Sequence, residues 1–374
     1  MTWSLEGRPL RAVLVSRLRY LGDVVMTTPV LEVLRRGDPD LKLGYLAEYS
    51  HGRILAGHPL VDRLHLLGTR RRGADARRRG RTSGGLGFWD ILRELRAERY
   101  DLAVDLFFNP RSSWLLRLAG ARYRIGGTTG SRRHLFTHTV RPAVFPPEEQ
   151  QALACAPGGL GEHLGRLAPL RHEQSGRSFL EYLREHFSGQ ILKPRLPRPS
   201  SLEGTAPAGL TDPYILLAPG ATWTSKEWPQ QQWRELALAL PKELGLPVHV
   251  LQPPGRQDDF QPLGNEARLL PVMDLPEVTR VLAGAALLIS VDGGIMHVAV
   301  GLGTPTVALF GPTDPALWFP YEKAGPYRVL ATRPPCAPCS RHACEEFICL
   351  PDLPTSVVLA AARDLLTRSR ADGP

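Results

Sequence analysis

Short apolar segments alternate with amphipathic segments along nearly the whole chain, and this alternation limits the possible folds more than any other feature. The apolar segments have the length and composition of strands, whereas the segments between them have helical periodicity. The alternation predicts α/β architecture, with parallel sheets covered by helices. The strand-like segments are 10–16, 41–47, 101–107, 214–220, 246–252, 285–293 and 304–312, and clear helical patterns include 88–98 and 111–120.

The segment 191–213 interrupts this pattern and is rich in Pro, Gly and Ser, as expected of a linker. A chain of 374 residues is also long for a single core. We therefore predict two α/β domains, at 1–200 and 201–374, and leave open whether the last helix packs back on the first domain. Ligands of open α/β sheets bind at the carboxyl ends of the strands.

The composition is that of an ordinary globular protein, with 43% hydrophobic and 22% charged residues. No segment at the start resembles a secretory signal. The most apolar region, 282–310, contains Asp292, His297 and several glycines, so it reads as strand, helix and strand rather than as a membrane span. Five cysteines without an export signal are expected to be reduced thiols, which predicts a cytoplasmic protein.

The formal net charge of +9 is concentrated at 70–81, RRRGADARRRGR, which holds seven arginines. Such a run is either a solvated loop or a surface for an anionic partner. Because no helix-turn-helix, zinc-finger or aromatic RNA-binding signature accompanies it, we expect no nucleic-acid partner. An acidic substrate or an anionic membrane surface remains possible.

Polar corners follow several of the predicted strands. In 218–229, Thr222, Thr224 and Ser225 supply hydroxyl groups and Lys226 a charge suited to a phosphate. The same residues could instead cap the following helix and face water. No Walker A motif is present, and the Asp38-Pro39-Asp40 turn reads as surface rather than as a metal site.

Two further corners carry a carboxylate beside glycine. Asp292 ends a buried strand and precedes Gly293 and Gly294, where a phosphate could approach the backbone and the helix N-terminus. In the first half, Gly22 and Asp23 follow the first strand. Each aspartate could be a helix cap or a chemical group of a binding site.

Five stretches resemble glycosyltransferase family 9, the ADP-heptose:lipopolysaccharide heptosyltransferases, in order and spacing. This resemblance implies a GT-B fold, with two Rossmann-like domains facing across a cleft. It further implies that the N-terminal domain binds the acceptor and the C-terminal domain the nucleotide sugar. The matching stretches are GDVVMTTPVLEVLR (22–35), 100–126, APGATWTSKEWPQQQW (218–233), 274–315 and CAPCSRHACEEFICL (336–350).

The resemblance also implies roles for individual residues. Asp23 would be the base of an inverting transfer, taking the proton of the acceptor hydroxyl as ADP leaves. Fixed donors would stabilise the diphosphate, and neither a metal nor a cofactor is expected. These donors would be Thr222, Ser225, Lys226 and the amides of Gly293 and Gly294. Asp292 would contact the sugar hydroxyls, and His297 would pack its helix. Met273 would line the adenine pocket, and Asp258 or Asp259 would bind the ribose.

The chain departs from the family pattern at two places. Many members have Ser or Thr where Gly293 stands, and a Gln-Gly-rich stretch where this chain has Phe107-Phe108-Asn109-Pro110. The second departure lies on the acceptor side, where Asn109 and Arg111 are expected to contact an acidic acceptor. The expected acceptor is the lipopolysaccharide inner core at the cytoplasmic face of the inner membrane, where the enzyme would bind peripherally.

Four alternatives remain at this stage. Cys336, Cys339, Cys344 and Cys349 have a spacing compatible with zinc, although we favour reduced structural thiols as the explanation. A nicotinamide-dependent oxidoreductase would need a Gly-x-Gly-x-x-Gly turn after the first strand, where RLRYLGD has one glycine. A non-enzymatic module would bind nucleic acid or anionic lipid through the arginine run. Another family member's nucleotide sugar or glycan acceptor is also compatible with the motifs.

Overall fold

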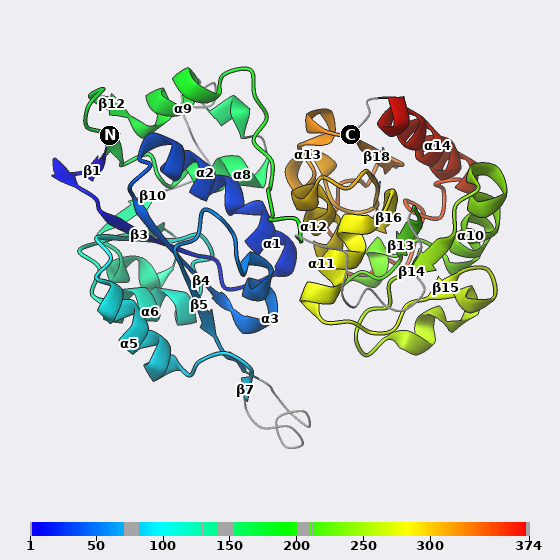
Figure 1. Cartoon of the computed structure of the whole chain (residues 1–374), viewed down its shortest axis with the longest axis horizontal. Coiled ribbons are helices and arrows are strands. Elements are labelled where there is room, and N and C mark those ends of the chain that lie inside the picture. Colours follow the sequence, from blue (N-terminus) through cyan, green and yellow to red (C-terminus); the bar gives the residue numbers. More distant parts are fainter. Residues whose placement is uncertain are drawn as a thin grey trace. The chain divides into compact units, whose positions relative to one another are not determined.

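The chain folds into two compact units, Met1–Pro197 and Arg198–Pro374. The computed structural model (Figure 1) describes residues 2–70, 82–128, 130–140, 153–156, 158–199, 210 and 213–371. The predicted boundary at 200 lies three residues beyond the one that separates the units. The arginine run falls almost wholly outside the described residues.

A parallel sheet forms the centre of the N-terminal unit. Among the described residues it has six strands in the order β10-β9-β8-β3-β4-β5, and every neighbouring pair is parallel. The buried pattern of Ala12–Ser16 explains why β3 can lie in the middle of the sheet, covered on both faces. The strands are β3 (Ala12–Ser16), β4 (Lys42–Glu48), β5 (Arg63–Leu67), β8 (Leu102–Asp105), β9 (Tyr123–Gly127) and β10 (His138–Val140).

Helices cover this sheet, and short antiparallel strands extend the unit. Leu14 of β3 packs with Leu92 of α5 and Leu115 of α6 in one apolar cluster. The helices are α1 (Leu21–Met26), α2 (Thr28–Gly37), α3 (Tyr49–Gly52), α5 (Phe88–Glu98), α6 (Pro110–Ala119), α8 (Gly159–Gly165) and α9 (Phe179–Phe187), with 3-10 turns η1 (Arg53–Leu55), η2 (Ser131–Leu135) and η3 (Leu153–Cys155). The short strands are β1 (Trp3–Leu5), β2 (Arg8–Pro9), β11 (Arg171–His172) and β12 (Arg177–Ser178) in one sheet, and β6 (Thr69–Arg70) with β7 (Thr82–Ser83) in another.

The C-terminal unit repeats the arrangement. Within its described part, six parallel strands lie in the order β15-β14-β13-β16-β17-β18. The strands are β13 (Ile215–Ala218), β14 (Val248–Val250), β15 (Arg268–Leu269), β16 (Leu287–Val291), β17 (Thr306–Phe310) and β18 (Tyr327–Ala331). The helices are α10 (Gln230–Leu244), α11 (Leu275–Gly284), α12 (Gly294–Leu302), α13 (Pro315–Trp318) and α14 (Thr355–Ala371), with 3-10 turns η4 (Thr224–Lys226), η5 (Gln257–Asn265) and η6 (Glu322–Ala324).

Both sheets have the strand order 3-2-1-4-5-6 of a doubly wound Rossmann fold. In each sheet the order reverses beside the first strand, between β3 and β8 in one unit and between β13 and β16 in the other. Ligands of such sheets bind at the carboxyl ends of the strands at this point. The α/β class and the two Rossmann-like domains of the GT-B fold are thus confirmed.

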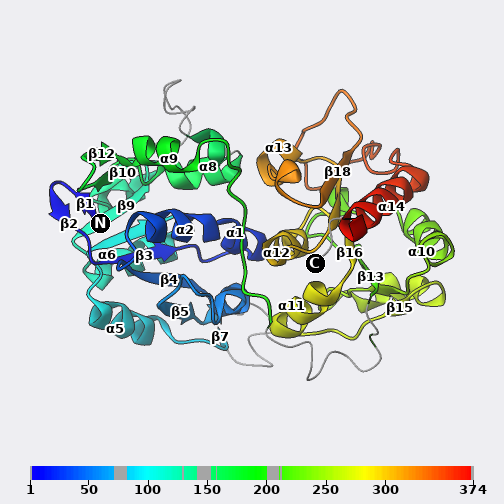
Figure 2. The same cartoon turned by 45° about the horizontal axis from the view of Figure 1, so that its top comes forward.

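The last helix packs within its own unit. Residues of α14 such as Val358 and Ala362 join Trp233 and Leu236 of α10 in the apolar cluster over the sheet. Figure 2 shows α14 beside α10. In the described parts of the chain, we find no helix long and apolar enough to cross a membrane.

Candidate active site

Asp23 lies in the first turn of α1, directly after β3. Its Oδ2 accepts a hydrogen bond from the Tyr20 N–H at 3.3 Å, which closes a capping box at the helix start. Asp23 therefore makes the hydrogen bond expected of a helix-capping residue. The side chain still keeps 16% of its surface exposed, so capping does not bury the carboxylate.

Arg17 holds the other oxygen of Asp23. One terminal nitrogen of the guanidinium makes an ion pair with Asp23 Oδ1, and the other donates to the Leu106 carbonyl at 2.7 Å. The guanidinium also lies 4.7 Å from the centre of the Phe107 ring. The carboxylate at this corner is thus fixed from two sides, by a backbone amide and by an arginine.

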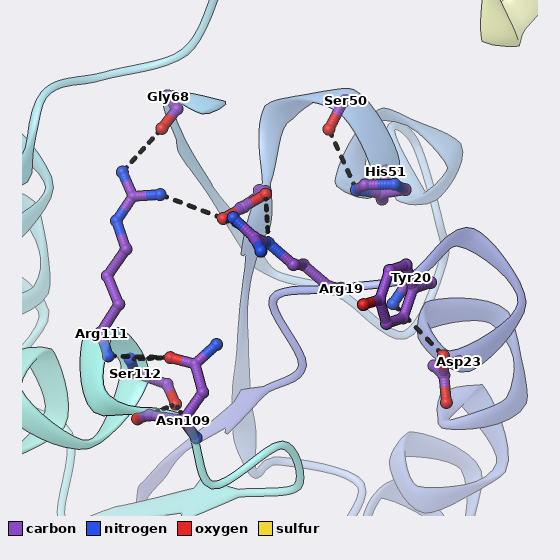
Figure 3. Close-up of polar contacts among 10 residues, drawn as sticks. Arg19, Tyr20, Asp23, Ser50, His51, Gly68, Asn109, Arg111 and Ser112 are labelled. Carbon is purple, nitrogen blue, oxygen red and sulfur yellow. Dashed lines mark hydrogen bonds and ion pairs between the residues drawn. The ribbon is translucent and has the colours of Figure 1, made fainter. Parts of the chain in front are cut away.

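A buried carboxylate joins two arginines near this corner (Figure 3). Glu48, at the end of β4, is 1% exposed and accepts bonds of 3.0 Å from both Arg19 and Arg111. Arg111 also donates to the Gly68 carbonyl at 2.7 Å, so its guanidinium is turned into the protein. The Arg19 side chain is 39% exposed. Arg111, which was expected to face the acceptor, contacts Glu48 and the Gly68 carbonyl, and its side chain is 23% exposed.

Asn109 is the N-cap of α6. Its Oδ1 accepts from the amides of Arg111 and Ser112 at 2.8 and 3.0 Å, as Figure 3 shows, so this oxygen serves the helix. Asp105, at the end of β8, holds the preceding loop by accepting from the amides of Phe107 and Phe108. Burial raises the pKa of the Asp105 carboxyl.

Lys226 and Asp292 meet at the corresponding point of the C-terminal unit. Lys226 Nζ lies 2.6 Å from Asp292 Oδ2, and the Thr313 hydroxyl donates to the same oxygen at 2.6 Å. The side chains of Lys226 and Asp292 are 14% and 5% exposed. The loops after β13, β16 and β17 are therefore joined through one carboxylate oxygen, and Lys226 is held in place rather than mobile.

Gly293 and Gly294 begin α12 beside this pair. Gly293 is the N-cap with extended backbone, and Gly294 is the first helical residue. The first amides of a helix have no intrahelical partner, and the helix dipole favours an anion there. A Cβ added to Gly293 would meet nothing closer than the Val291 carbonyl at 3.8 Å. The backbone therefore does not require glycine at this position.

Two expected hydroxyl donors lie differently from each other. Ser225 is buried, and its hydroxyl donates a hydrogen bond to the Arg341 carbonyl at 2.6 Å. This hydroxyl therefore binds the backbone of the cysteine run. Thr222 is exposed at the start of the same loop. Of the two, only Thr222 has an exposed side chain, as a hydroxyl that contacts the diphosphate requires.

The remaining expected residues are placed as follows. His297 is buried, and its Nδ1 is hydrogen-bonded to the Tyr321 hydroxyl, so the imidazole packs α12 against η6. Burial raises the pKa of Tyr321 well above its usual range. Met273 is partly exposed in the loop before α11. Asp259 is paired with Arg256 at 2.6 Å.

The cysteine run covers the carboxyl ends of the C-terminal sheet. The amide of Cys339 donates to the Pro312 carbonyl at 2.9 Å, after β17. Cys336, Cys339, Cys344 and Cys349 are free thiols. The described residues contain no group of three or more His, Cys, Asp or Glu side chains placed to hold a metal ion. The zinc alternative therefore gains no support from the geometry.

Four polar residues of this site were not named from the sequence alone, namely Arg17, Glu48, Asp105 and Thr313. Each lies at or just after the carboxyl end of a strand, namely β3, β4, β8 and β17. That position was the available signal, because polar residues at this edge line the ligand site of a doubly wound sheet. The partners of Glu48 and Thr313 are at least 21 residues distant along the chain, so no local pattern identifies them.

The chain is similar to known glycosyltransferases. The profile of glycosyltransferase family 9 (heptosyltransferase) matches residues 185–347. The chain is 30% identical to lipopolysaccharide heptosyltransferase 1 of Pseudomonas aeruginosa over 338 residues, which are 89% of this chain and 87% of that protein.

Two solved structures share the fold. The crystal structure of the family 9 glycosyl transferase from Veillonella parvula has a TM-score of 0.73 at 22% identity, covering 96% of this chain and 97% of that one. ADP-heptose lps heptosyltransferase II of E. coli has a TM-score of 0.70 at 20% identity, covering 96% and 99%. Taken with the identity over nine-tenths of the chain, these matches show that the chain belongs to glycosyltransferase family 9, the heptosyltransferases, and is a glycosyltransferase.

Proposed function

We propose that the chain transfers a heptose from ADP-heptose to the inner core of lipopolysaccharide, with inversion at the anomeric carbon. The observation that carries the proposal is that Asp23 and the Lys226–Asp292 pair each stand at the reversal point of a doubly wound sheet. The names of the similar proteins supply the donor and the acceptor: one is a lipopolysaccharide heptosyltransferase and another an ADP-heptose lps heptosyltransferase.

In this proposal Asp23 is the general base. The acceptor oxygen attacks the anomeric carbon of the donor, the bond from that carbon to the diphosphate oxygen breaks, and the hydroxyl proton passes to the Asp23 carboxylate. The contacts of Arg17 and the Tyr20 amide support this role because they hold the carboxylate in one orientation. A base fixed in this way loses little orientational freedom when the acceptor binds.

The leaving diphosphate is stabilised by fixed donors. Lys226 and the first amides of α12 offer positive potential at one point of the sheet edge. Asp292 uses Oδ2 for Lys226 and Thr313, and we assign its Oδ1 to the sugar hydroxyls. Thr222 adds an exposed hydroxyl to the diphosphate, and Met273 borders the adenine.

On the acceptor side we assign the anionic contact to Arg19. The buried Glu48, which Arg111 also contacts, holds the Arg19 guanidinium, and the Arg19 side chain is 39% exposed. A guanidinium recognises both carboxylates and phosphates through parallel hydrogen bonds. Asn109 contributes by capping α6, which carries Arg111.

We further propose that the enzyme binds peripherally to the anionic cytoplasmic face of the inner membrane, where such an acceptor is held. The net charge of +9 supports this location. Trp89 of α5 and Trp114 of α6 also support it, because they are 67% and 49% exposed on neighbouring helices. Tryptophan prefers the interface between lipid and water.

The Asp23→Asn variant tests the reaction. We expect its turnover to fall by about 10²- to 10⁴-fold, the usual contribution of a positioned base. ADP affinity, measured by calorimetry, should stay at the wild-type value, because all residues proposed to bind the nucleotide sugar belong to the other unit. Wild-type turnover in this variant would leave Asp23 with the capping role alone.

A thermal-shift panel of ADP-, GDP-, UDP- and dTDP-sugars tests the donor. A ligand that binds only the folded protein raises Tm by mass action. We expect ADP-heptose to give the largest shift. A larger shift with another nucleotide sugar would favour the alternative that this chain uses a different donor, which the glycine at position 293 makes worth testing.

A further inference from the structure

An aromatic stack connects the cysteine run to Lys226. Trp223, just before η4, lies against His342 with ring centres 3.8 Å apart and planes inclined by 24°. The ammonium nitrogen of Lys226 lies 4.2 Å from the centre of the same indole. The indole therefore contacts both the imidazole and the lysine.

Hydrogen bonds fix this stack across a long stretch of sequence. The Ser225 hydroxyl donates to the Arg341 carbonyl at 2.6 Å, and the Ser225 amide donates to the His342 carbonyl at 3.4 Å. The Thr224 hydroxyl donates to the same carbonyl at 3.4 Å. The backbone at 341–342 is thus attached to η4, which places the imidazole beside the indole.

We propose that His342 is a positioning residue for the donor diphosphate. Its ring supports Trp223, and Trp223 with Asp292 keeps the Lys226 ammonium at one place on the sheet edge. This inference rests on the proposed function, in which Lys226 meets the diphosphate. It also gives the segment around the cysteines a part in the reaction that does not involve its thiols.

The physical reason is the flexibility of lysine. Its ammonium ends a four-carbon stem, so an unrestrained side chain loses much rotational freedom when it binds a phosphate. A side chain already held by an indole face and a carboxylate loses less, and affinity rises accordingly. Removal of the ring behind the indole should therefore weaken the diphosphate contact without removing any group that touches the ligand.

The test compares His342→Ala with His342→Phe, using ADP as the probe in calorimetry. An aromatic pair contributes enough that its loss corresponds to about a two- to tenfold change in affinity. We expect His342→Ala to raise the Kd of ADP, and the KM of the nucleotide sugar, by this factor. His342→Phe keeps a flat ring against Trp223 and should restore both constants. The acceptor KM should not change.

A matched control lies in the other unit. His186 is stacked on Tyr182 with ring centres 4.0 Å apart and planes inclined by 19°. His186→Ala removes the same kind of ring pair and should leave the Kd of ADP at the wild-type value. A Trp223→Leu background should abolish the effect of His342→Ala, because the two rings act as one unit.

Three results would overturn the inference. An unchanged Kd of ADP in His342→Ala would make the stack structural only, as would a fall in kcat with unchanged donor KM. Failure of His342→Phe to restore affinity would assign the effect to the imidazole itself. Lys226→Ala separates this inference from the proposed function: if that variant binds ADP weakly while His342→Ala binds normally, only the positioning role fails. Normal ADP binding by Lys226→Ala would refute both the positioning role of His342 and the proposed contact of Lys226 with the diphosphate.

Discussion

At the scale of single residues, the protein uses carboxylates that each hold two partners. Asp23 accepts from a backbone amide and an arginine, Glu48 from two arginines, and Asp292 from a lysine and a threonine. Each lies at the carboxyl edge of a strand, where the ligand of a doubly wound sheet binds. A carboxylate at such an edge can both fix the local backbone and act on a ligand, so capping and catalysis are compatible for Asp23.

Substitution of Lys226 separates stability from binding. In Lys226→Met the buried Asp292 carboxylate loses its cation, and breaking a buried pair in this way costs about 3–5 kcal/mol of unfolding free energy. The double variant Lys226→Met/Asp292→Asn removes both charges and should recover most of that stability in denaturant titrations. Neither variant should bind ADP normally. Recovery of ADP affinity in the double variant would show that Lys226 acts only as the counterion of Asp292.

Glu48→Gln tests the acceptor assignment. The variant removes the charge that holds Arg19 and Arg111. We therefore expect the free energy of unfolding to fall by about 1–3 kcal/mol and the acceptor KM to rise. Glu98→Gln is the matched control, since Glu98 also holds two cations, Lys42 and Arg63, but near the start of β4. That control should lose stability without changing the acceptor KM. Equal acceptor KM values in the two variants would refute the assignment of Arg19.

At the scale of elements, the N-cap of α12 is a glycine and so offers no side chain. The backbone at Gly293 has φ of −170° and ψ of 177°, an extended conformation open to any residue, and the space around a Cβ is empty to 3.8 Å. A serine here could cap the helix or donate to a diphosphate. A serine side chain therefore fits at this helix end without strain.

Gly293→Ser should therefore be tolerated and should bind ADP more tightly, by about three- to tenfold if the hydroxyl donates to the charged diphosphate. Gly303→Ser at the other end of α12 is the control, because Gly303 has φ of +75° and a side chain there is strained. We expect the control to lower Tm by several degrees. Calorimetry and thermal unfolding measure both effects. Weaker ADP binding in Gly293→Ser would mean that the glycine makes room for the ligand itself.

The alternation of apolar segments predicted the elements well because it reports local burial. The apolar segment 10–16 contains β3 (Ala12–Ser16), and 285–293 contains β16 (Leu287–Val291). The same pattern did not reveal β1 or β11, because strands of two or three residues have no measurable periodicity. It also did not show that Ser225 donates to Arg341, since a side-chain bond across 116 residues leaves no trace in local sequence.

The site could be predicted only in part, for a related reason. Residue type and sequence pattern placed Asp23, Lys226 and Asp292 after predicted strands, and the structure has them after β3, β13 and β16. The orientation of Arg111 depends on Glu48, 63 residues earlier, and on the Gly68 carbonyl. An arginine beside a buried carboxylate turns inward, and only the tertiary structure shows that the carboxylate is there.

At the scale of the whole molecule, the two units separate the proposed roles. Asp23, Arg19 and Glu48 belong to Met1–Pro197, whereas Lys226 and Asp292 belong to Arg198–Pro374. Substitutions with no shared partner usually act independently. Donor affinity and acceptor affinity should therefore respond to separate sets of variants, which allows the membrane proposal to be tested without disturbing ADP binding.

Lipid vesicles test the arginine run at 70–81 and the exposed Trp89 and Trp114 as membrane contacts. Basic residues near an anionic membrane contribute about 1 kcal/mol each, and salt screens this attraction over about 10 Å at 0.1 M. We expect salt-sensitive binding to vesicles of anionic lipid and none to neutral vesicles, measured by co-sedimentation. A variant with Arg70–Arg72 and Arg77–Arg79 replaced by serine should lose most of this binding. Trp89→Ala/Trp114→Ala should weaken the part that persists at high salt, since tryptophan binds the interface through its ring.

Leu238→Ala provides the control for exposed apolar surface, because Leu238 is 47% exposed on α10 of the other unit, close to the 49% of Trp114. This variant should bind vesicles like the wild type. Both membrane variants should raise the KM for an acceptor embedded in vesicles and leave the Kd of ADP unchanged, because the proposed ADP site lies in the C-terminal unit. Unchanged vesicle binding after the six arginine substitutions would assign the run at 70–81 to solvated loop. The attraction to the membrane would then have to come from the rest of the positive charge.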